Sequence, residues 1–319
     1  MPTHDSPQPS PLASEPEQSA SALAGVLSVV QMPYHEDESI DWATLGREID
    51  WLYEHGVDGL VFAMVSEVLR LSERERAAVT EFMVKHNRQR GCVVTSVGAE
   101  STYRACEQAR EAEGAGVDAV MAIPPIAVAM EEDELRRYYD RLARATALPV
   151  IVQDASGYVG APMSIAMQAQ LCLDLGSRIA FKPEAVPIGP RLTALHEATG
   201  GKARAFEGTG GIALVDSYRR GIVGTMPGAE IIWAIRALWD ALHDGDTQRI
   251  NRIAMPVAAL IAMQHHLDAF LAIEKYLLVK QGVFPNMLVR GPVGYRLDEG
   301  TRLEVDRIFT ELDRAVRPA

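Results

Sequence analysis

The sequence lacks long apolar runs, although apolar residues make up 48% of its 319 residues. A helix that crosses a membrane needs about 18 or more consecutive apolar residues, so we expect neither a membrane span nor a membrane partner. Residues 1–22 are rich in proline and serine and also lack the basic start and apolar centre of a secretion signal. We therefore expect a cytoplasmic protein that begins with a disordered tail over residues 1–22.

Cysteine is scarce, and no spacing of acidic or histidine residues suggests a metal site. Cys92, Cys106 and Cys172 are the three cysteines, and no two of them stand in a CxxC pair. This spacing argues against a zinc site or a disulfide framework and favours buried thiols in a reducing compartment. We expect neither a metal ion nor another cofactor.

Basic residues are in the minority. The chain has 31 Lys and Arg against 43 Asp and Glu, which gives a net charge of -12. No cluster of Lys and Arg offsets this balance, and an acidic surface repels phosphate backbones. Nucleic-acid binding is therefore disfavoured.

The sequence does contain a regular alternation of short apolar runs with amphipathic stretches. Apolar runs of about 4–8 residues are typical of parallel strands that are covered on both faces. The predicted strands are Gly25–Gln31, Gly59–Ala63, Cys92–Gly98, Ala119–Pro124, Val150–Asp154, Ile179–Glu184, Arg204–Glu207 and Gly221–Met226. The predicted helices between them are Trp42–Tyr53, Ser72–Asn87, Ser101–Gly114, Glu132–Thr146, Ser164–Leu175 and Pro190–Thr199.

Eight strand–helix units predict an α/β fold, a (β/α)8 barrel over residues 23–229. The alternative is an open doubly wound sheet, which is less favoured because no GxGxxG motif follows the first strand. Residues 230–319 look helical, at Glu230–Asp244, Thr247–His266 and Leu267–Gln281. We expect this C-terminal extension to pack on the barrel or to form an oligomer surface.

Lys182 stands inside the sixth predicted strand, Ile179–Glu184. Burying a lysine is unfavourable unless the amine is paired or neutral, so the alternative is a strand-edge lysine that reaches solvent. Apolar neighbours favour the neutral amine, which is the form that attacks a ketone to give a Schiff base. Alternation along a strand places Glu184 on the same side, about 6–7 Å further on. Glu184 could transfer protons there or hold the lysine as an ion pair.

Small polar residues and glycines follow the other predicted strands. Chemistry in such barrels takes place at the ends of the strands, and exposed backbone N–H groups in loops of this kind suit a carboxylate ligand. The fifth strand ends with Gln153 and Asp154, and the loop after the seventh strand contains Gly208 and Thr209. Asp154 could contact a substrate, although capping the loop after its strand is the simpler role.

Six segments in a fixed order connect the sequence to a known family. They are GVLSVVQMPYHEDESIDWATLGREIDWLYEHGVDGL, AMVSEVLRLSERER, LPVIVQDASGYVG, AFKPE, FEGTGG and GIVGTMPG. Over about residues 24–315 they resemble the dihydrodipicolinate synthase / N-acetylneuraminate lyase superfamily. The resemblance implies a (β/α)8 barrel that binds a small-molecule 2-keto acid as a Schiff base on Lys182, and it implies a homo-oligomer, either a tetramer or a dimer.

Departures from the family pattern narrow this interpretation. The tyrosines that relay protons in the synthases and aldolases are replaced by Gln153 and Ile126, and two loop threonines are replaced by Met64 and Val65. The Gln-Asp-Ala, Ser-Glu and Phe-Lys-x-Glu stretches are similar to dehydratase-like members that act on 2-keto-3-deoxy-L-arabonate. Those members have a histidine where this chain has Ala99, so the substrate could differ.

The resemblance also implies roles for individual residues. Lys182 would form the imine, Glu184 would act as the acid and base, and Gln153 would contact substrate or water. Tyr158 stands where relatives have an arginine that meets a carboxylate, although a packed aromatic at the rim is the alternative. The implied substrate contacts are Val65, Ser66, Glu67, Asp154, Tyr158, Gly208, Thr209 and Val223.

Dehydration of a 2-keto-3-deoxy sugar acid fits these residues better than aldol cleavage does. Aldol cleavage needs a base for the C4 hydroxyl proton, and the tyrosine that normally passes this proton on is missing. Glu184 beside the imine could take the C3 proton and then protonate the departing C4 hydroxyl. The open alternatives are a pyruvate-dependent aldolase, a hydroxypyrroline-carboxylate deaminase, and a barrel that binds a keto acid without turnover.

Overall fold

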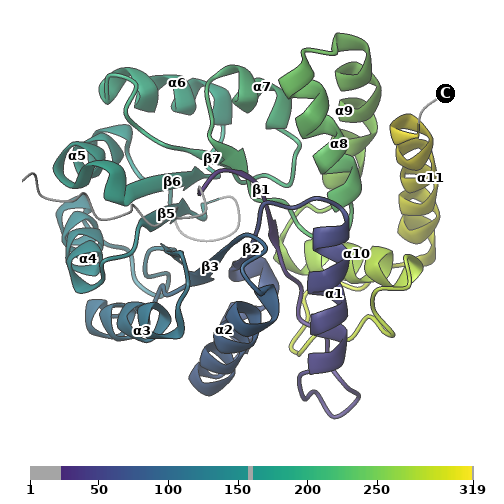
Figure 1. Cartoon of the computed structure of the whole chain (residues 1–319), viewed down its shortest axis with the longest axis horizontal. Helices are drawn as coiled ribbons and strands as arrows, with labels where there is room; N and C mark the ends of the chain where they lie inside the picture. Colours follow the sequence, from purple (N-terminus) through teal and green to yellow (C-terminus); the bar gives the residue numbers. More distant parts are fainter. Residues whose placement is uncertain (1–22, 157–160, 318–319) are drawn as a thin grey trace, which may run out of the picture.

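Eight parallel strands form a nearly closed barrel at the centre of the molecule (Figure 1). The computed structural model describes residues 23–156 and 161–317, so the predicted tail at residues 1–22 and Tyr158 lie outside the described residues. The strands are β1 (Gly25–Val29), β2 (Gly59–Phe62), β3 (Cys92–Ser96), β4 (Ala119–Ala122), β5 (Val150–Asp154), β6 (Ile179–Pro183), β7 (Phe206–Glu207) and β8 (Gly224–Thr225).

The order of hydrogen-bonded neighbours is that of a barrel. It runs β6-β5-β4-β3-β2-β1-β8-β7, and a parallel bridge between Phe181 and Ala205 joins the two ends. The predicted (β/α)8 barrel is therefore confirmed, and the open doubly wound sheet is not formed. Most strands end earlier than predicted, and β8 begins later, at Gly224.

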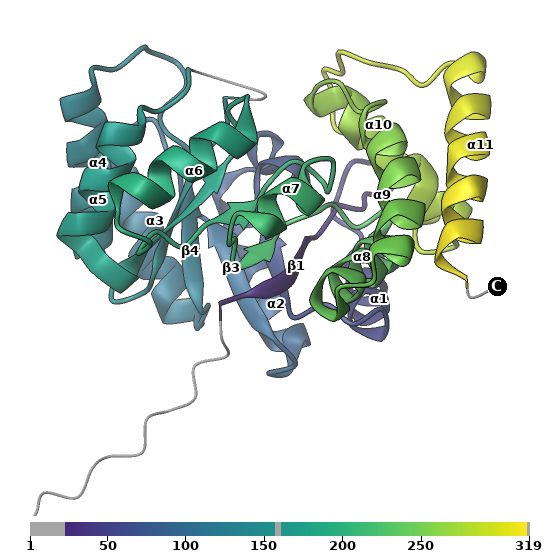
Figure 2. The ribbon, with the colours of Figure 1, turned by 90° about the horizontal axis from the view of Figure 1, so that it is seen from above.

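Helices surround the strands on the outside of the barrel (Figures 1 and 2). They are α1 (Trp42–Glu54), α2 (Glu73–Asn87), α3 (Thr102–Ala115), α4 (Glu132–Ala145), α5 (Ile165–Leu175), α6 (Ile188–Ala198), α7 (Leu214–Arg219) and α8 (Ile232–Asp244). Ser72 caps α2 together with Glu75 in a reciprocal capping box, because the serine oxygen accepts from an otherwise unpaired first-turn N–H group.

The C-terminal part adds α9 (Thr247–Ile261), α10 (Leu267–Lys280) and α11 (Glu299–Val316). Helix α9 packs against both α8 and α11, and Figure 1 shows this group at one side of the barrel. The predicted C-terminal helices are therefore present. Among the helices of residues 23–156 and 161–317, none is long and apolar enough to cross a membrane.

The strands are buried on both faces, as parallel strands between a lumen and a helical layer must be. Alternate residues such as Met121, Ile151 and Ala180 belong to an apolar cluster in the lumen. Their neighbours, including Val152 and Phe181, pack in the larger cluster against the helices. This alternation decides which side chains can reach the centre of the barrel.

Candidate active site

Lys182 lies near the C-terminal end of β6 and points to the lumen side of the barrel. Ala180, two residues earlier, is in the lumen cluster, whereas Phe181 packs on the outer side. The lysine is 5% exposed. The prediction of a lysine buried inside a strand is confirmed, and the alternative of an edge lysine that reaches solvent is wrong.

Glu184 and Gln153 contact the lysine directly. The Lys182 amine donates a hydrogen bond to Glu184 Oε1, and Gln153 Nε2 donates to the same oxygen at 2.7 Å. Gln153 reaches this position because the parallel register pairs it with Lys182 across β5 and β6. The expectation that Lys182 and Glu184 face the same side is therefore confirmed, and Gln153 completes the group.

The environment of Glu184 favours its protonated form. Burial raises the pKa of the Glu184 carboxyl above its ordinary range, while Lys182 and Gln153 oppose this rise and the charge of Asp154 adds to it. Oε2 of Glu184 is buried and has no hydrogen-bond partner within the described part of the chain. A carboxyl with a raised pKa and one unoccupied oxygen is suited to accepting and returning a proton.

A small cavity, about 20 Å³, opens beside the lysine. Its lining residues come from the ends of several strands and from α10: Val29, Ala63, Met64, Val65, Gln153, Lys182, Gly208, Gly210, Met226, Gly228 and Phe270. Gly208 is very close, since its carbonyl lies 3.5 Å from Lys182 Nζ. Of the predicted substrate contacts, Val65 and Gly208 line this cavity.

Three other predicted contacts hold the conformation of their own loops. Ser66 Oγ accepts from the Ala63 N–H at 3.1 Å, and the Thr209 N–H donates to Glu207 at 2.8 Å. Asp154 accepts from the Ser156 N–H at 3.2 Å. Each interaction fixes a loop at the mouth of the barrel, so these residues support the site from behind its lining.

Two further predicted contacts, Glu67 and Val223, do not line the cavity beside Lys182. Glu67 forms a buried ion pair with Lys275 and accepts from the Arg290 N–H at 3.2 Å. Val223 immediately precedes β8, and its N–H donates to Ala205 at 2.8 Å, at the end of the barrel opposite the lysine. Val223 therefore does not line the cavity beside Lys182, because it lies before β8 and not at the C-terminal end of that strand.

A group of buried acids beside the cavity was missed by the sequence analysis. Gln31 donates to Glu274 and, at 3.1 Å, to the Val65 carbonyl, and the charge of Glu230 helps to raise the pKa of Glu274. Burial raises the pKa of Glu230, Glu274 and Glu48. The sequence contained one indication of these buried acids. Glu48 lies on the buried face of α1, one turn after Thr44 and one turn before Leu52.

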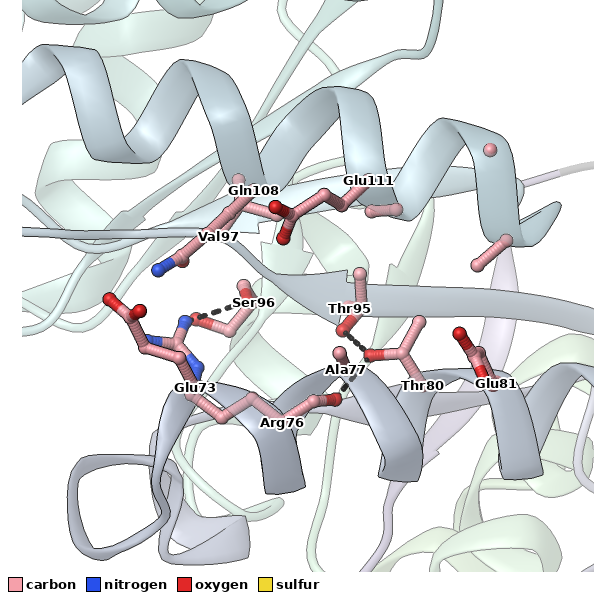
Figure 3. Close-up of a pocket in the computed structure, with 13 residues that line it drawn as sticks. Glu73, Arg76, Ala77, Thr80, Glu81, Thr95, Ser96, Val97, Gln108 and Glu111 are labelled. Atoms are coloured by element: carbon pink, nitrogen blue, oxygen red, sulfur yellow. Dashed lines mark hydrogen bonds between the residues drawn. The ribbon is translucent and has the colours of Figure 1, made fainter.

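A larger cavity of about 290 Å³ lies outside the barrel, between α2 and α3 (Figure 3). Arg76 donates to the Ser96 carbonyl at 2.9 Å there, and the Thr80 and Thr95 hydroxyls are 2.8 Å apart. None of the residues that line this cavity is a lysine, so it offers no amine that could form a Schiff base. Across the described residues, no three His, Cys, Asp or Glu side chains gather as metal ligands, and the three cysteines are free and buried, as predicted.

Comparisons with known proteins agree with this geometry. The model of the dihydrodipicolinate synthetase family matches residues 22–312. The chain is 26% identical over 297 residues to the L-2-keto-3-deoxyarabonate dehydratase of Azospirillum brasilense, covering 92% of this chain and 95% of that protein. It is 29% identical over 161 residues to the 4-hydroxy-tetrahydrodipicolinate synthase of Bartonella bacilliformis, and this match spans 50% of this chain and 55% of that protein.

Solved structures show the same fold. The 4-hydroxy-tetrahydrodipicolinate synthase of Methylacidiphilum fumariolicum SolV superimposes with a TM-score of 0.83 at 20% identity. The match covers 92% of this chain and 97% of that one. At this identity the likeness supports the barrel and its added helices, while the chemistry depends on the residues at the strand ends.

Proposed function

The chain belongs to the dihydrodipicolinate synthetase family, and from this premise we propose that it is a lyase that binds a 2-keto acid as a Schiff base on Lys182. The observation that supports this most directly is the Lys182–Glu184–Gln153 group, buried at the C-terminal end of β5 and β6. Enzymes with this barrel place their chemistry at that face.

Imine formation follows from the contacts of the amine. The neutral Lys182 nitrogen attacks C2 of the keto acid, the C2 oxygen takes one proton from this nitrogen and a second from solvent, and it leaves as water, which gives a protonated imine. The substrate carboxylate is expected near the turn Met64–Ser66, a short 3-10 helix at the cavity. The leading N–H groups of such a turn have no partners within the helix.

We propose dehydration as the next step, with a 2-keto-3-deoxy acid as the substrate. The protonated imine at C2 withdraws electrons and acidifies C3, so Glu184 removes a C3 proton and an enamine forms. Glu184 then protonates the C4 hydroxyl, water leaves, and hydrolysis of the imine releases the product and the free lysine. The similarity to an L-2-keto-3-deoxyarabonate dehydratase along 92% of this chain supports this choice.

Aldol chemistry is the second candidate, because a 4-hydroxy-tetrahydrodipicolinate synthase is also among the relatives. Cleavage of C3–C4 needs a base for the C4 hydroxyl proton, and among the described residues no tyrosine lines the cavity. Product analysis separates the two: dehydration gives no pyruvate, whereas cleavage gives pyruvate and an aldehyde. A homo-oligomer and a cytoplasmic location stay predictions.

The test of the proposed Schiff base is trapping with borohydride. Pyruvate plus borohydride is expected to add the mass of pyruvic acid less one oxygen to the intact chain, at Lys182. Lys182→Ala should abolish the adduct, and Lys202→Ala, which removes an exposed lysine, should leave it unchanged. Mass spectrometry of the intact protein and its peptides measures both, and an adduct that survives Lys182→Ala would overturn the proposal.

A further inference from the structure

The cavity beside Lys182 is apolar apart from its reacting end. Lys182 and Gln153 supply its polar side chains, and three glycines contribute backbone. All other lining side chains are apolar: Val29, Ala63, Met64, Val65, Met226 and Phe270. A bound substrate therefore meets polar side chains at one end and apolar ones elsewhere.

Two separate apolar clusters continue this lining. Below the lysine, Val29 and Met226 belong to the cluster that fills the barrel lumen. At the mouth, Met64 packs with Ile123 and Ala155, and Leu267 joins them from the start of α10. The apolar surface thus extends from the floor of the cavity to its rim, across the ends of β2, β4 and β5.

Two polar side chains near the cavity, Gln31 and Thr209, already donate their hydrogen bonds to protein partners. The Gln31 amide donates to Glu274 and to the Val65 carbonyl, and the Thr209 hydroxyl donates to Glu207. Within the described chain, two unpartnered acceptors do lie beside the lysine, Gln153 Oε1 and Glu184 Oε2. Both are next to the imine, where C3 and C4 of a bound keto acid would lie.

We propose that the substrate is a 2-keto acid whose chain beyond C4 is apolar, with Met64, Val65 and Phe270 selecting for it. This rests on the proposed Schiff-base function and narrows its substrate. The C4 hydroxyl faces Glu184, but among the described residues that line the cavity, no side chain beyond Lys182 and Gln153 can pair with a hydroxyl on C5 or C6. Each such hydroxyl is expected to lower kcat/KM by about 10–100-fold, so a polyhydroxylated sugar acid is a poor substrate.

The experiment compares two acids that differ in a single hydroxyl, 4-hydroxy-2-oxopentanoate and 4,5-dihydroxy-2-oxopentanoate. Chromatography follows the consumption of each acid, and this readout does not depend on whether the reaction releases water or an aldehyde. Inactivation by borohydride at increasing concentrations of each acid gives the concentration that half-saturates Lys182. The deoxy compound is expected to be preferred at least about 10-fold in kcat/KM. Equal use of both acids, or preference for the dihydroxy acid, overturns the inference.

Variants of the wall test the residues themselves. Met64→Thr and Val65→Thr place hydroxyls in the lining and should reduce the preference for the deoxy acid several-fold. Leu173→Thr alters a side chain that is 55% exposed on α5 and should leave the ratio unchanged. If the ratio of kcat/KM for the two acids is unchanged in both Met64→Thr and Val65→Thr, these two side chains do not select the substrate.

Trapping with pyruvate distinguishes a failure of the substrate inference from a failure of the Schiff-base function. If pyruvate is trapped at Lys182 but the two acids are used equally, the substrate inference fails and the Schiff-base function stands. If neither pyruvate nor either acid is trapped by the wild-type protein, the Schiff-base function fails and the inference fails with it.

Discussion

Glu184 accepts hydrogen bonds on one of its two oxygens only. Lys182 and Gln153 both donate to Oε1, and this fixes the orientation of the carboxyl group in the barrel. Oε2 has no partner among the described residues, and the proposed mechanism uses it to exchange protons with a bound substrate. In that mechanism Gln153 acts through Glu184 as a positioning residue, whereas a tyrosine at this place would exchange protons itself.

Glu184→Gln should separate imine formation from turnover. The amide cannot carry protons between C3 and the C4 hydroxyl, so kcat should fall by about 10²–10⁴-fold. Lys182 is unchanged, so trapping of pyruvate by borohydride should persist. Steady-state kinetics with a 4-hydroxy-2-keto acid and intact-mass measurement give the two readouts.

Glu197→Gln is the matched control, because Glu197 is exposed on α6, and it should change neither readout. Full turnover by Glu184→Gln would reduce Glu184 to an ion-pair partner of the lysine. Loss of both trapping and turnover would instead place Glu184 in imine formation.

Among the elements, the loop after β7 approaches the lysine most closely. A Cβ atom built on Gly208 would lie 2.8 Å from Lys182 Cγ and 3.2 Å from Glu184 Cγ. These distances are shorter than normal contacts between carbon atoms. Only glycine leaves both side chains in their observed positions.

Gly208→Ala should therefore displace Lys182 and slow its reaction. The lysine can rotate away, so we expect a loss of imine formation, at least about 10-fold by the sensitivity of catalysis to small misplacements, with little change in melting temperature. The rate of inactivation by pyruvate and borohydride measures the first effect, and thermal unfolding followed by circular dichroism measures the second.

Gly114→Ala is a contrasting control. Gly114 lies in α3, and a Cβ there meets nothing within 4 Å, so alanine should stabilise the helix by about 0.5–1 kcal/mol without affecting trapping. Normal trapping rates in Gly208→Ala would show that the loop moves to accept the methyl group.

The strand–helix alternation could be predicted because each strand is buried on both faces and so is a continuous apolar run. Helix α7, Leu214–Arg219, was missed because six residues are fewer than two turns and show no periodicity. Helix α11 was missed because its buried positions, such as Val305, Ile308 and Leu312, form a narrow stripe among charged residues. Its packing against α9 determines its position.

The Lys182–Glu184 pair could be predicted because its spacing is local to one strand. The acids beside the cavity could not be located in the same way. Gln31 and Glu274 are 243 positions apart, and only the closed barrel and the path of α10 bring them together. Glu67 was assigned to the substrate for a related reason, since its partner Lys275 is 208 positions away.

At the scale of the whole molecule, the interior contains more acids than bases in one region. Glu48, Glu67, Glu230 and Glu274 are each at most 2% exposed, and the Lys275 amine is paired with Glu67. Unpaired buried carboxylates are very unfavourable. Burial therefore favours the protonated form of carboxyl groups in this cluster, and it raises the pKa values of Glu48, Glu230 and Glu274.

The acid cluster also joins distant elements around the active site. Glu274 of α10 accepts from the Ala229 N–H at 2.8 Å, next to Gly228 in the cavity wall. Gln31 connects the same carboxyl to the loop after β2, and Glu48 of α1 accepts from the Gln31 N–H at 2.7 Å. These hydrogen bonds join the cluster to two loops that line the site.

Stability should therefore fall as the pH rises above the ordinary range of glutamate. The folded-state pKa values of Glu230 and Glu274 lie above 4.5, their ordinary value, so the folded protein retains protons that the unfolded chain releases. This stabilisation is complete below pH 4.5 and is lost as the pH rises through the folded-state values. Exposed acids with lowered pKa values, such as Asp298, act in the opposite sense and only at lower pH.

Glu274→Gln tests this directly, because the amide has nearly the same shape and does not ionise in this range. The free energy of unfolding in urea, measured from pH 5 to pH 8, should decline less steeply with pH in Glu274→Gln than in the wild-type protein. Because the folded variant retains one proton fewer, its slope of the free energy of unfolding against pH should differ from the wild-type slope by at most about 1.4 kcal/mol per pH unit. Glu197→Gln removes one exposed charge and should keep the wild-type slope, which controls for the net charge. Equal slopes in all three proteins would mean that Glu274 is ionised in the folded state.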